Sequence, residues 1–263
     1  MLGAIIGDIV GSRFEFNNLK SKDFQFFHHR CRPTDDSVMS LALAQAILDC
    51  NGQYDDLSEK AVQRMQELGR IYPNAGYGGH FRAWLQDDDP QPYNSYGNGA
   101  AMRVSPCGFA AESLEQAIDL ADKVTCVTHD HPEGMKAAEA VAATIFLARQ
   151  GKTMAELREY VTVNFYPLDF TLDEIRPRYT FHVSCQGSVP QAFEAFFESK
   201  DYEDAIRNAI SIGGDSDTIA AITGGIAEAY YGIPVTIEKM GMVFLDTRQR
   251  EILEAFRERY SAV

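Results

Sequence analysis

The sequence predicts an all-α protein, and three observations carry that prediction. Apolar residues recur at helical spacing in most segments, and several of these segments follow a Ser, Thr or Asp. No segment shows a convincing alternation with a period of two, which a half-buried strand would require. Residues 219–227 are small or apolar throughout, so a helix there would be packed from every side. We therefore expect roughly ten helices around one central helix.

The N-terminal segment 1–16 predicts a short buried helix with small faces, ending near Arg13. Glu15 follows directly after this apolar helix. A charged residue is rarely buried without a partner, so Glu15 is either a surface residue paired with Arg13 or Lys20, or a member of a functional site. Residues 17–33 are polar and aromatic without a period, and they predict a loop.

Further along the chain, helical segments alternate with two long loops. Residues 71–98 are rich in Gly, Pro, Asn and Tyr with one short turn at 81–85, and residues 165–179 are rich in Pro. Long loops inside a compact domain are usually functional. The remaining helices are expected at 38–48, 56–70, 100–103, 111–124, 134–150, 154–163 (after a capping box at Thr153 and Glu156), 191–197, 201–212, from 218 onward, and 235–260.

Length and composition limit the classes of protein. The chain has 263 residues, of which 45% are hydrophobic, and no linker-like tract, so we expect one domain over residues 1–263 and a monomer. The net charge of −14 argues against nucleic acid or an anionic membrane as a general partner, although a local basic pocket for a phosphorylated ligand is allowed.

Cysteine usage and the N-terminus indicate the compartment. The five cysteines are widely spaced, odd in number and without a C-x-x-C pair, which is typical of reduced, buried thiols. The N-terminus lacks a basic region before its apolar run, and no uncharged apolar run reaches membrane-spanning length. We expect a cytoplasmic protein without membrane contact.

Two clusters of oxygen-bearing side chains each open an apolar segment. They are Thr34, Asp35 and Asp36 near the N-terminus, and Asp215, Asp217 and Thr218 before the central helix. One such cluster alone is more typical of a helix cap, which needs one side-chain oxygen. Two clusters of the same composition favour a shared site for hard cations such as Mg2+ or Mn2+.

Other motifs indicate a nucleotide-like ligand. The Ser95–Gly99 loop precedes a helix-compatible segment and is either a phosphate-binding turn or an ordinary turn. Stacking faces for a base are available at Tyr72, Tyr77, Tyr93 and Tyr96. His129 and His131 lack the further ligands of a zinc site, so we expect packed or pocket-lining histidines. Together these motifs predict a hydrolase that acts on a nucleotide-like molecule. They do not decide whether the bond that it cleaves is a phosphate ester, a pyrophosphate or a glycosidic bond.

Six short motifs in order resemble the ADP-ribosylglycohydrolase family, the ADP-ribosyl-acceptor hydrolases that include the dinitrogenase-reductase-activating enzyme. One departure is Ser37, where many members have Thr. The motifs are Gly7–Gly11 with Glu15, Thr34–Ser37, Tyr96–Arg103, Thr128–Pro132, Gly187–Pro190 and Gly213–Thr218.

The resemblance implies a compact orthogonal helical bundle with a cleft that holds two Mg2+ or Mn2+ ions. Its implied metal ligands are Thr34, Asp35, Asp36, Asp215, Asp217 and Thr218. Its implied catalytic residues are Glu15, as an acid/base or metal-gating carboxylate, with Asp35 and Asp36. Its implied ADP-ribose contacts are Ser95, Tyr96, Gly97, Asn98, Gly99 and His129.

The implied activity is metal-dependent cleavage of the glycosidic bond between ADP-ribose and a modified acceptor, either an ADP-ribosylated protein or another ADP-ribose conjugate. Two alternatives stay open: a non-catalytic ADP-ribose-binding module, and a di-metal hydrolase of a small phosphorylated nucleotide metabolite. We expect the acceptor side to be formed by the loops 17–33, 71–94 and 165–183.

Overall fold

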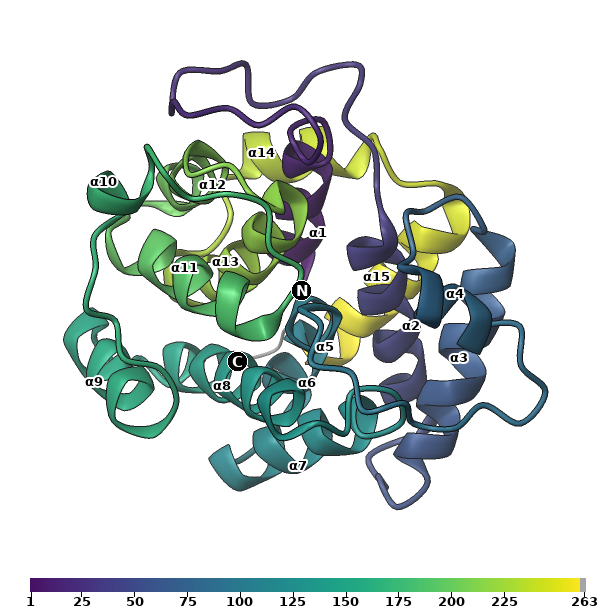
Figure 1. Cartoon of the computed structure of the whole chain (residues 1–263). Helices are drawn as coiled ribbons and strands as arrows, with labels where there is room; N and C mark the ends of the chain where they lie inside the picture. Colours follow the sequence, from purple (N-terminus) through teal and green to yellow (C-terminus); the bar gives the residue numbers. More distant parts are fainter. Residues whose placement is uncertain (261–263) are drawn as a thin grey trace.

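The computed structural model describes residues 1–260, and over this range the chain forms helices and no β-strand (Figure 1). One isolated antiparallel bridge joins Gly97 to Ser184. The all-α prediction is confirmed. The helices are α1 (Leu2–Gly11), α2 (Asp35–Asp49), α3 (Leu57–Ile71), α4 (Gly79–Trp84), α5 (Gly99–Met102), α6 (Ser105–Ala110), α7 (Leu114–Thr125), α8 (Pro132–Arg149), α9 (Met154–Asn164), α10 (Leu172–Ile175), α11 (Cys185–Phe197), α12 (Tyr202–Ser211), α13 (Ser216–Tyr231), α14 (Val235–Met242) and α15 (Thr247–Tyr260).

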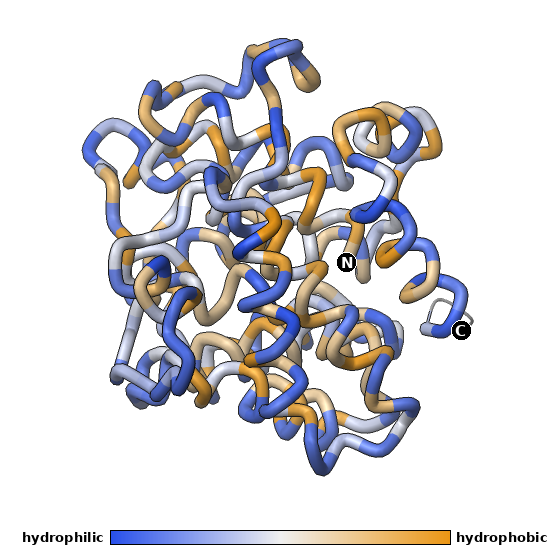
Figure 2. The backbone as a smooth tube through the Cα atoms, turned by 90° about the vertical axis from the view of Figure 1, so that its right-hand side faces the viewer, coloured by the Kyte–Doolittle hydropathy of each residue, from blue (hydrophilic) through white to orange (hydrophobic). Residues whose placement is uncertain are grey.

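Helix α13 is the centre of the molecule, as its sequence predicts. Every residue from Ser216 to Ala227 is buried, and α1, α8, α11 and α12 all pack against this helix. Figure 1 shows α13 beside α1, with α11 and α12 on its outer side. Hydrophilic and hydrophobic residues alternate along the helices at the edge of the molecule (Figure 2), as expected for helices with one buried face.

Close backbone contact between α1 and α13 depends on glycine. A Cβ atom placed on Gly7 would lie 2.0 Å from the carbonyl oxygen of Ala220, and one on Gly11 would lie 2.6 Å from the Cα of Asp217. No larger residue fits at either position without moving a backbone. This contact places the C-terminal half of α1 directly beside the first turn of α13.

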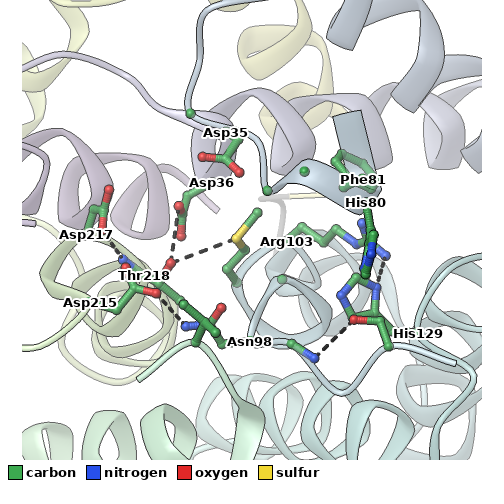
Figure 3. A pocket seen from close by; sticks show the side chains of 18 of the residues that line it. Asp35, Asp36, His80, Phe81, Asn98, Arg103, His129, Asp215, Asp217 and Thr218 are labelled. Carbon is green, nitrogen blue, oxygen red and sulfur yellow. Dashed lines mark hydrogen bonds between the residues drawn. The ribbon is translucent and has the colours of Figure 1, made fainter. Parts of the chain in front are cut away.

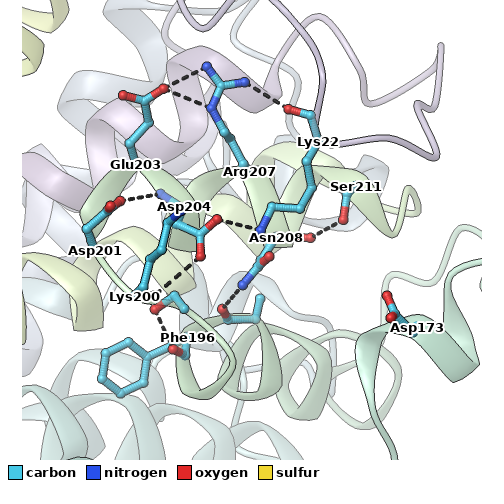
Figure 4. Close-up of polar contacts among 12 residues, drawn as sticks. Lys22, Asp173, Phe196, Lys200, Asp201, Glu203, Asp204, Arg207, Asn208 and Ser211 are labelled. Carbon is cyan, nitrogen blue, oxygen red and sulfur yellow. Dashed lines mark hydrogen bonds and ion pairs between the residues drawn. The ribbon is translucent and has the colours of Figure 1, made fainter.

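The predicted loop 17–33 has no regular structure and is fastened onto α12 (Figure 4). The Arg207 guanidinium donates to the backbone carbonyl oxygens of Lys22, at 2.9 Å, and Phe24, at 2.8 Å. The same guanidinium pairs with Glu203 one turn earlier on α12. Arg207 and the Lys22–Asp204 ion pair therefore tie the segment that follows Glu15 to α12.

Three predicted segments differ from the structure, and local capping explains each difference. The segment 165–179 contains a helical turn, α10, because Thr171 and Glu174 form a capping box. Helix α11 begins at Cys185 and not at 191, because the Ser184 hydroxyl accepts from the backbone N–H of Gly187. Pro190 therefore lies inside the helix rather than in its first turn.

The third difference lies in the segment predicted as one helix over 235–260. This segment is two helices, α14 and α15, with a break between Met242 and Thr247. Asp246 explains the restart, since its carboxylate accepts from the backbone N–H of Gln249 at 2.9 Å. Helix α6 is an additional short helix that the sequence did not predict.

All five cysteines are free, and only Cys126 is not fully buried. Over residues 1–260, no helix combines the length and apolar character needed to cross a bilayer.

Candidate active site

The two acidic clusters meet at the end of α1 (Figure 3). Asp36 opens α2 and Asp217 opens α13, and each offers an oxygen within 4.8 Å of the other and of Asp8. Asp215, Asp217 and Glu15 form a second group within the same 4.8 Å limit. Because Asp217 belongs to both groups, the carboxylates form one continuous patch.

Neither cluster serves as a helix cap. Thr34 and Asp215 occupy the N-cap positions of α2 and α13, and neither side chain makes a capping hydrogen bond. Asp201 shows the ordinary arrangement at α12, where its carboxylate accepts from the backbone N–H of Asp204 at 2.8 Å (Figure 4). The capping interpretation is therefore wrong for both clusters.

Asp8 organises the first turn of α2, a role that the sequence did not predict. Its carboxylate accepts from the Thr34 backbone N–H at 2.9 Å, the Thr34 hydroxyl at 2.6 Å and the Ser37 backbone N–H at 3.0 Å, and also from the Ser37 hydroxyl. These four donors occupy the lone pairs that a cation would need. The available signal was an acid inside the apolar run of α1.

Burial and mutual repulsion dominate the electrostatics. Burial raises the pKa of Asp36 and Asp217 well above the usual range for a carboxyl, and neighbouring carboxylates raise both further. Burial and then the negative charge of Asp8 raise the pKa of Asp35 to about 7. Within residues 1–260 no Lys, Arg or His forms an ion pair with these three groups. The Asp36 Oδ1 atom is buried and has no hydrogen-bond partner.

Glu15 belongs to the same patch and not to the surface. Arg13 donates to the backbone oxygen of Gln25, and Lys20 donates to the backbone oxygen of Tyr179, so neither pairs with Glu15. Burial, followed by repulsion from Asp215, raises the pKa of Glu15 to about 7. The alternative of an ion-paired surface residue is therefore wrong.

Asp215 is held by a side-chain amide and by a constrained turn. The Asn98 amide donates to Asp215 Oδ2 at 2.7 Å and to the Ser188 hydroxyl at 3.1 Å. The turn before α13 has positive φ at Gly213, 69°, and at Gly214, 78°. Asn18 brackets Gly214 by donating to its carbonyl oxygen and accepting from its N–H, both at 2.8 Å.

These groups line one end of a cleft of about 340 Å3. Of the predicted site residues, two are absent from the lining. Thr34 is buried against Asp8, and Tyr96 lies half exposed with its ring 5.2 Å from that of His131. The predicted residues that line the cleft are Glu15, Asp35, Asp36, Ser95, Gly97, Asn98, Gly99, His129, Asp215, Asp217 and Thr218.

The positively charged side chain of Arg103 lies buried at the other end of the cleft (Figure 3). The Arg103 guanidinium donates to the Thr128 hydroxyl at 2.5 Å and contacts His129 Nδ1 at 3.3 Å. Burial lowers the pKa of Arg103 to about 10, so it remains charged at neutral pH. Burial, and then Arg103, lower the pKa of His129 well below its usual range, so the imidazole is neutral. The predicted site did not include Arg103.

The Ser95–Gly99 loop differs from the predicted phosphate-binding turn in one respect. Helix α5, which follows it, is a single turn from Gly99 to Met102, so its dipole contributes little. Two of the loop's backbone donors already have partners, because Gly97 donates to the Ser95 hydroxyl and Asn98 to the carbonyl oxygen of Val183. Charge for an anion at this end would come from Arg103.

The contacts of His129 and His131 do not indicate a zinc site. His131 Nδ1 accepts from the backbone N–H of Glu133 at the start of α8, while His129 contacts Thr128. In the part of the chain that the structure describes, the groups spaced to hold a metal consist of carboxylates alone. The site therefore offers hard oxygen ligands.

A family model described as ADP-ribosylglycohydrolase matches residues 1–239, so the chain belongs to the ADP-ribosylglycohydrolase family. A solved structure titled ADP-ribosylglycohydrolase-related protein complex superimposes with a TM-score of 0.68 at 24% identity, covering 100% of this chain and 97% of the other. That likeness confirms the fold.

Three curated relatives are similar to this chain over most of its length. ADP-ribosylhydrolase ARH3 of Gallus gallus is 23% identical over 95% of this chain and 89% of its own. ADP-ribosylarginine hydrolase Tri1 of Serratia proteamaculans is 26% identical over 88% of this chain and 70% of its own. ADP-ribosyl-[dinitrogen reductase] glycohydrolase of Rhodospirillum rubrum is 26% identical over 88% of this chain and 84% of its own.

Proposed function

We propose that this protein is a metal-dependent hydrolase that releases ADP-ribose from a modified acceptor by cleaving the glycosidic bond. The observation that carries the proposal is the carboxylate patch formed by the starts of α2 and α13. Among residues 1–260, no Lys, Arg or His lines the cleft at that end, and the buried Arg103 lines the other. The names of the relatives support the same class of reaction.

The residues fit two hard divalent cations, Mg2+ or Mn2+. Buried carboxylates of like charge need a compensating positive charge, and the unpartnered Asp36 Oδ1 is an available ligand atom. Asp35, Asp36, Asp215, Asp217 and Thr218 would hold the ions. Thr34 could become a ligand only if its hydroxyl gave up its hydrogen bond to Asp8. Bound cations would neutralise the carboxylates and orient vicinal hydroxyls of the ribose.

Glu15 is the proposed acid/base. It is half buried at the edge of the patch, and without bound cations burial and the negative charge of Asp215 raise its pKa to about 7. Cleavage at the anomeric carbon passes through an oxocarbenium-like state, in which the leaving acceptor gains a proton and water loses one. A carboxyl group at this position can carry both transfers in turn.

The arginine end of the cleft is the proposed pyrophosphate and base site. Arg103 supplies a buried positive charge, and the Ser95–Gly99 loop approaches His129 closely, since a Cβ on Gly99 would lie 3.3 Å from His129 Nε2. Tyr93 and Phe81 line the same end and offer aromatic faces to a base. We also propose that residues 1–263 act as one domain, which the single buried core supports.

Release of ADP-ribose tests the proposal. The protein is incubated with ADP-ribosylated peptides that carry arginine or serine linkages, with Mg2+ or Mn2+ and with a chelator. Intact ADP-ribose should be released when Mg2+ or Mn2+ is present and should not be released in chelator. Release of AMP or phosphate would identify a hydrolase of phosphorylated metabolites, and ADP-ribose binding without release would identify a binding module.

A further inference from the structure

The side chain of Asn18 joins two segments that lie 196 residues apart in the sequence. Its Nδ2 atom donates to the backbone oxygen of Gly214 at 2.8 Å, and its Oδ1 atom accepts from the backbone N–H of Gly214, also at 2.8 Å. The same Nδ2 atom lies 3.0 Å from the backbone oxygen of Glu15 and 2.7 Å from that of Phe14. A side-chain amide has two N–H donors, so these three carbonyl oxygens share them. Both polar atoms of the Asn18 amide are therefore occupied by backbone groups.

Each end of this bridge adjoins a residue of the candidate active site. Gly214 directly precedes Asp215, and its N–H and C=O groups belong to the two peptide planes on either side of it. By binding both groups, Asn18 fixes the direction in which the chain enters Asp215. At the other end, Asn18 contacts the backbone of Glu15 itself.

The contact through Asn18 opposes a repulsion inside the cleft. The side-chain oxygens of Glu15 and Asp215 lie within 4.8 Å of each other, and their negative charges repel. The two side chains therefore cannot keep their segments together on their own. Asn18 supplies neutral hydrogen bonds that hold the same two segments side by side from outside the cleft.

The rest of the loop 17–33 is fastened without Asn18. Lys20 donates to the backbone oxygen of Tyr179 at 2.6 Å. Arg207 donates to two backbone oxygens further along the loop, at 2.9 and 2.8 Å (Figure 4). Neither contact involves Glu15 or Gly214. Loss of the Asn18 amide should therefore leave the loop attached and change only how the two ends of the bridge are held.

We propose that Asn18 is a positioning residue that couples the placement of Glu15 to the binding of a divalent cation at Asp215. When Asp215 is ordered as a ligand, Gly214 is ordered with it, and Asn18 passes that constraint to the backbone of Glu15. Coupling between two sites is reciprocal, so a well-held Glu15 segment favours cation binding in turn. This inference rests on the proposed function, and Asn18 takes no part in the proton transfers.

Hydrogen exchange and calorimetry test the coupling without any substrate. In the wild type, Mg2+ or Mn2+ should slow exchange of the backbone amides of residues 14–19 as well as those of residues 213–218. In Asn18→Ala the protection of 14–19 should be lost, and the cation affinity measured by calorimetry should fall about 10-fold. Asn18→Ser, which is too short to span both segments, should behave in the same way. Cation binding that leaves 14–19 unprotected in the wild type, or protects this segment in both variants, would overturn the coupling.

Arg207→Met is the matched control, because it loosens the same loop at contacts that do not involve Glu15 or Gly214. The control should keep the wild-type cation affinity and the protection of residues 14–19. An equal loss in Arg207→Met would show that general attachment of the loop is sufficient, and it would overturn the specific role of Asn18. Asn18 lies at the surface, so its variants should remain folded, which thermal unfolding checks.

A double-mutant cycle on turnover tests whether Asn18 acts through Glu15. With saturating cation and an ADP-ribosylated peptide that the wild type cleaves, Asn18→Ala should lower kcat about 10-fold and leave KM unchanged. In the Glu15→Gln background the same substitution should lower kcat less than about twofold. Equal losses in the two backgrounds, or a wild-type kcat in Asn18→Ala, would overturn the coupling and leave the hydrolase intact. A wild type that binds cations and protects 14–19 but releases no ADP-ribose would overturn the proposed function and leave the coupling intact.

Discussion

Replacing Asp217 by asparagine is the most informative perturbation of the carboxylate patch. Asp217 is 3% exposed and belongs to both groups of oxygens that lie within 4.8 Å. Asparagine keeps the shape of the side chain, and its oxygen can still accept from the Thr218 backbone N–H, which Asp217 holds at 3.1 Å. The substitution therefore removes one negative charge and one ligand while preserving the start of α13.

Two opposite effects on stability follow from this change. Without cations, the variant should unfold at a higher temperature than the wild type, because burial and the charges of Asp36 and Asp215 disfavour the ionised form of Asp217. For each cation bound at about 100 times its dissociation constant, the wild type should gain about 2.7 kcal/mol. For a chain of this size that gain corresponds to a rise in Tm of about 5 to 11 °C. The variant should lose most of this rise.

Thermal unfolding in chelator and in saturating Mg2+ or Mn2+ measures both effects. Asp201→Asn is the matched control, since Asp201 also opens a helix but serves as an ordinary cap that asparagine can replace. The control should show the full wild-type rise with cation. A full rise in Asp217→Asn, or a lower Tm than wild type in chelator, would refute the assignment of Asp217 to a cation site.

Three further predictions concern individual contacts. Asn98→Ala removes the amide that holds Asp215 and should weaken cation binding about 10- to 100-fold by calorimetry; unchanged affinity would show that the amide does not position a ligand. Glu15→Gln should keep the cation-dependent rise in Tm but slow ADP-ribose release by about 10²- to 10⁴-fold, and a wild-type rate would remove Glu15 from the mechanism. Burial, then repulsion from Glu139, raise the pKa of Asp122 from 3.8 to about 7, so the unfolding free energy that Asp122 contributes should fall as pH rises from about 4 to about 7. Asp122→Asn should remove that dependence on pH. In urea unfolding at pH 8, the free energy of unfolding of the variant should exceed that of the wild type by about 1 to 2 kcal/mol, a value reduced for solvent screening at this partly exposed site. A lower free energy of unfolding at pH 8 would contradict the repulsion.

Local signals in the sequence account for most of the secondary structure. The capping box at Thr153 and Glu156 predicts the start of α9, and both of its hydrogen bonds form. The small residues of α13 predict its complete burial. The failures occur where a weak signal competes with a stronger one, as at α11, where proline suggested a first turn but the Ser184 cap lies earlier.

The site was predictable in its residue types but not in its supporting contacts. Two clusters of the same chemistry predicted a shared site before the fold was known, and the structure brings their carboxylates together. That the site holds cations stays a prediction. The roles of Asp8, Asn98 and Arg103 depend on contacts between distant segments, which no spacing in the sequence encodes. The orientation of Tyr96 away from the cleft is likewise a tertiary feature, set by its contact with His131.

The most direct test of the account is one measurement of product with and without a divalent cation. The protein is incubated with a panel of arginine- and serine-linked ADP-ribosylated peptides, and the released nucleotide is identified by mass. The account predicts intact ADP-ribose in Mg2+ or Mn2+ and none in chelator. Cleavage that persists in chelator, or no ADP-ribose from any linkage with the cation present, would contradict it.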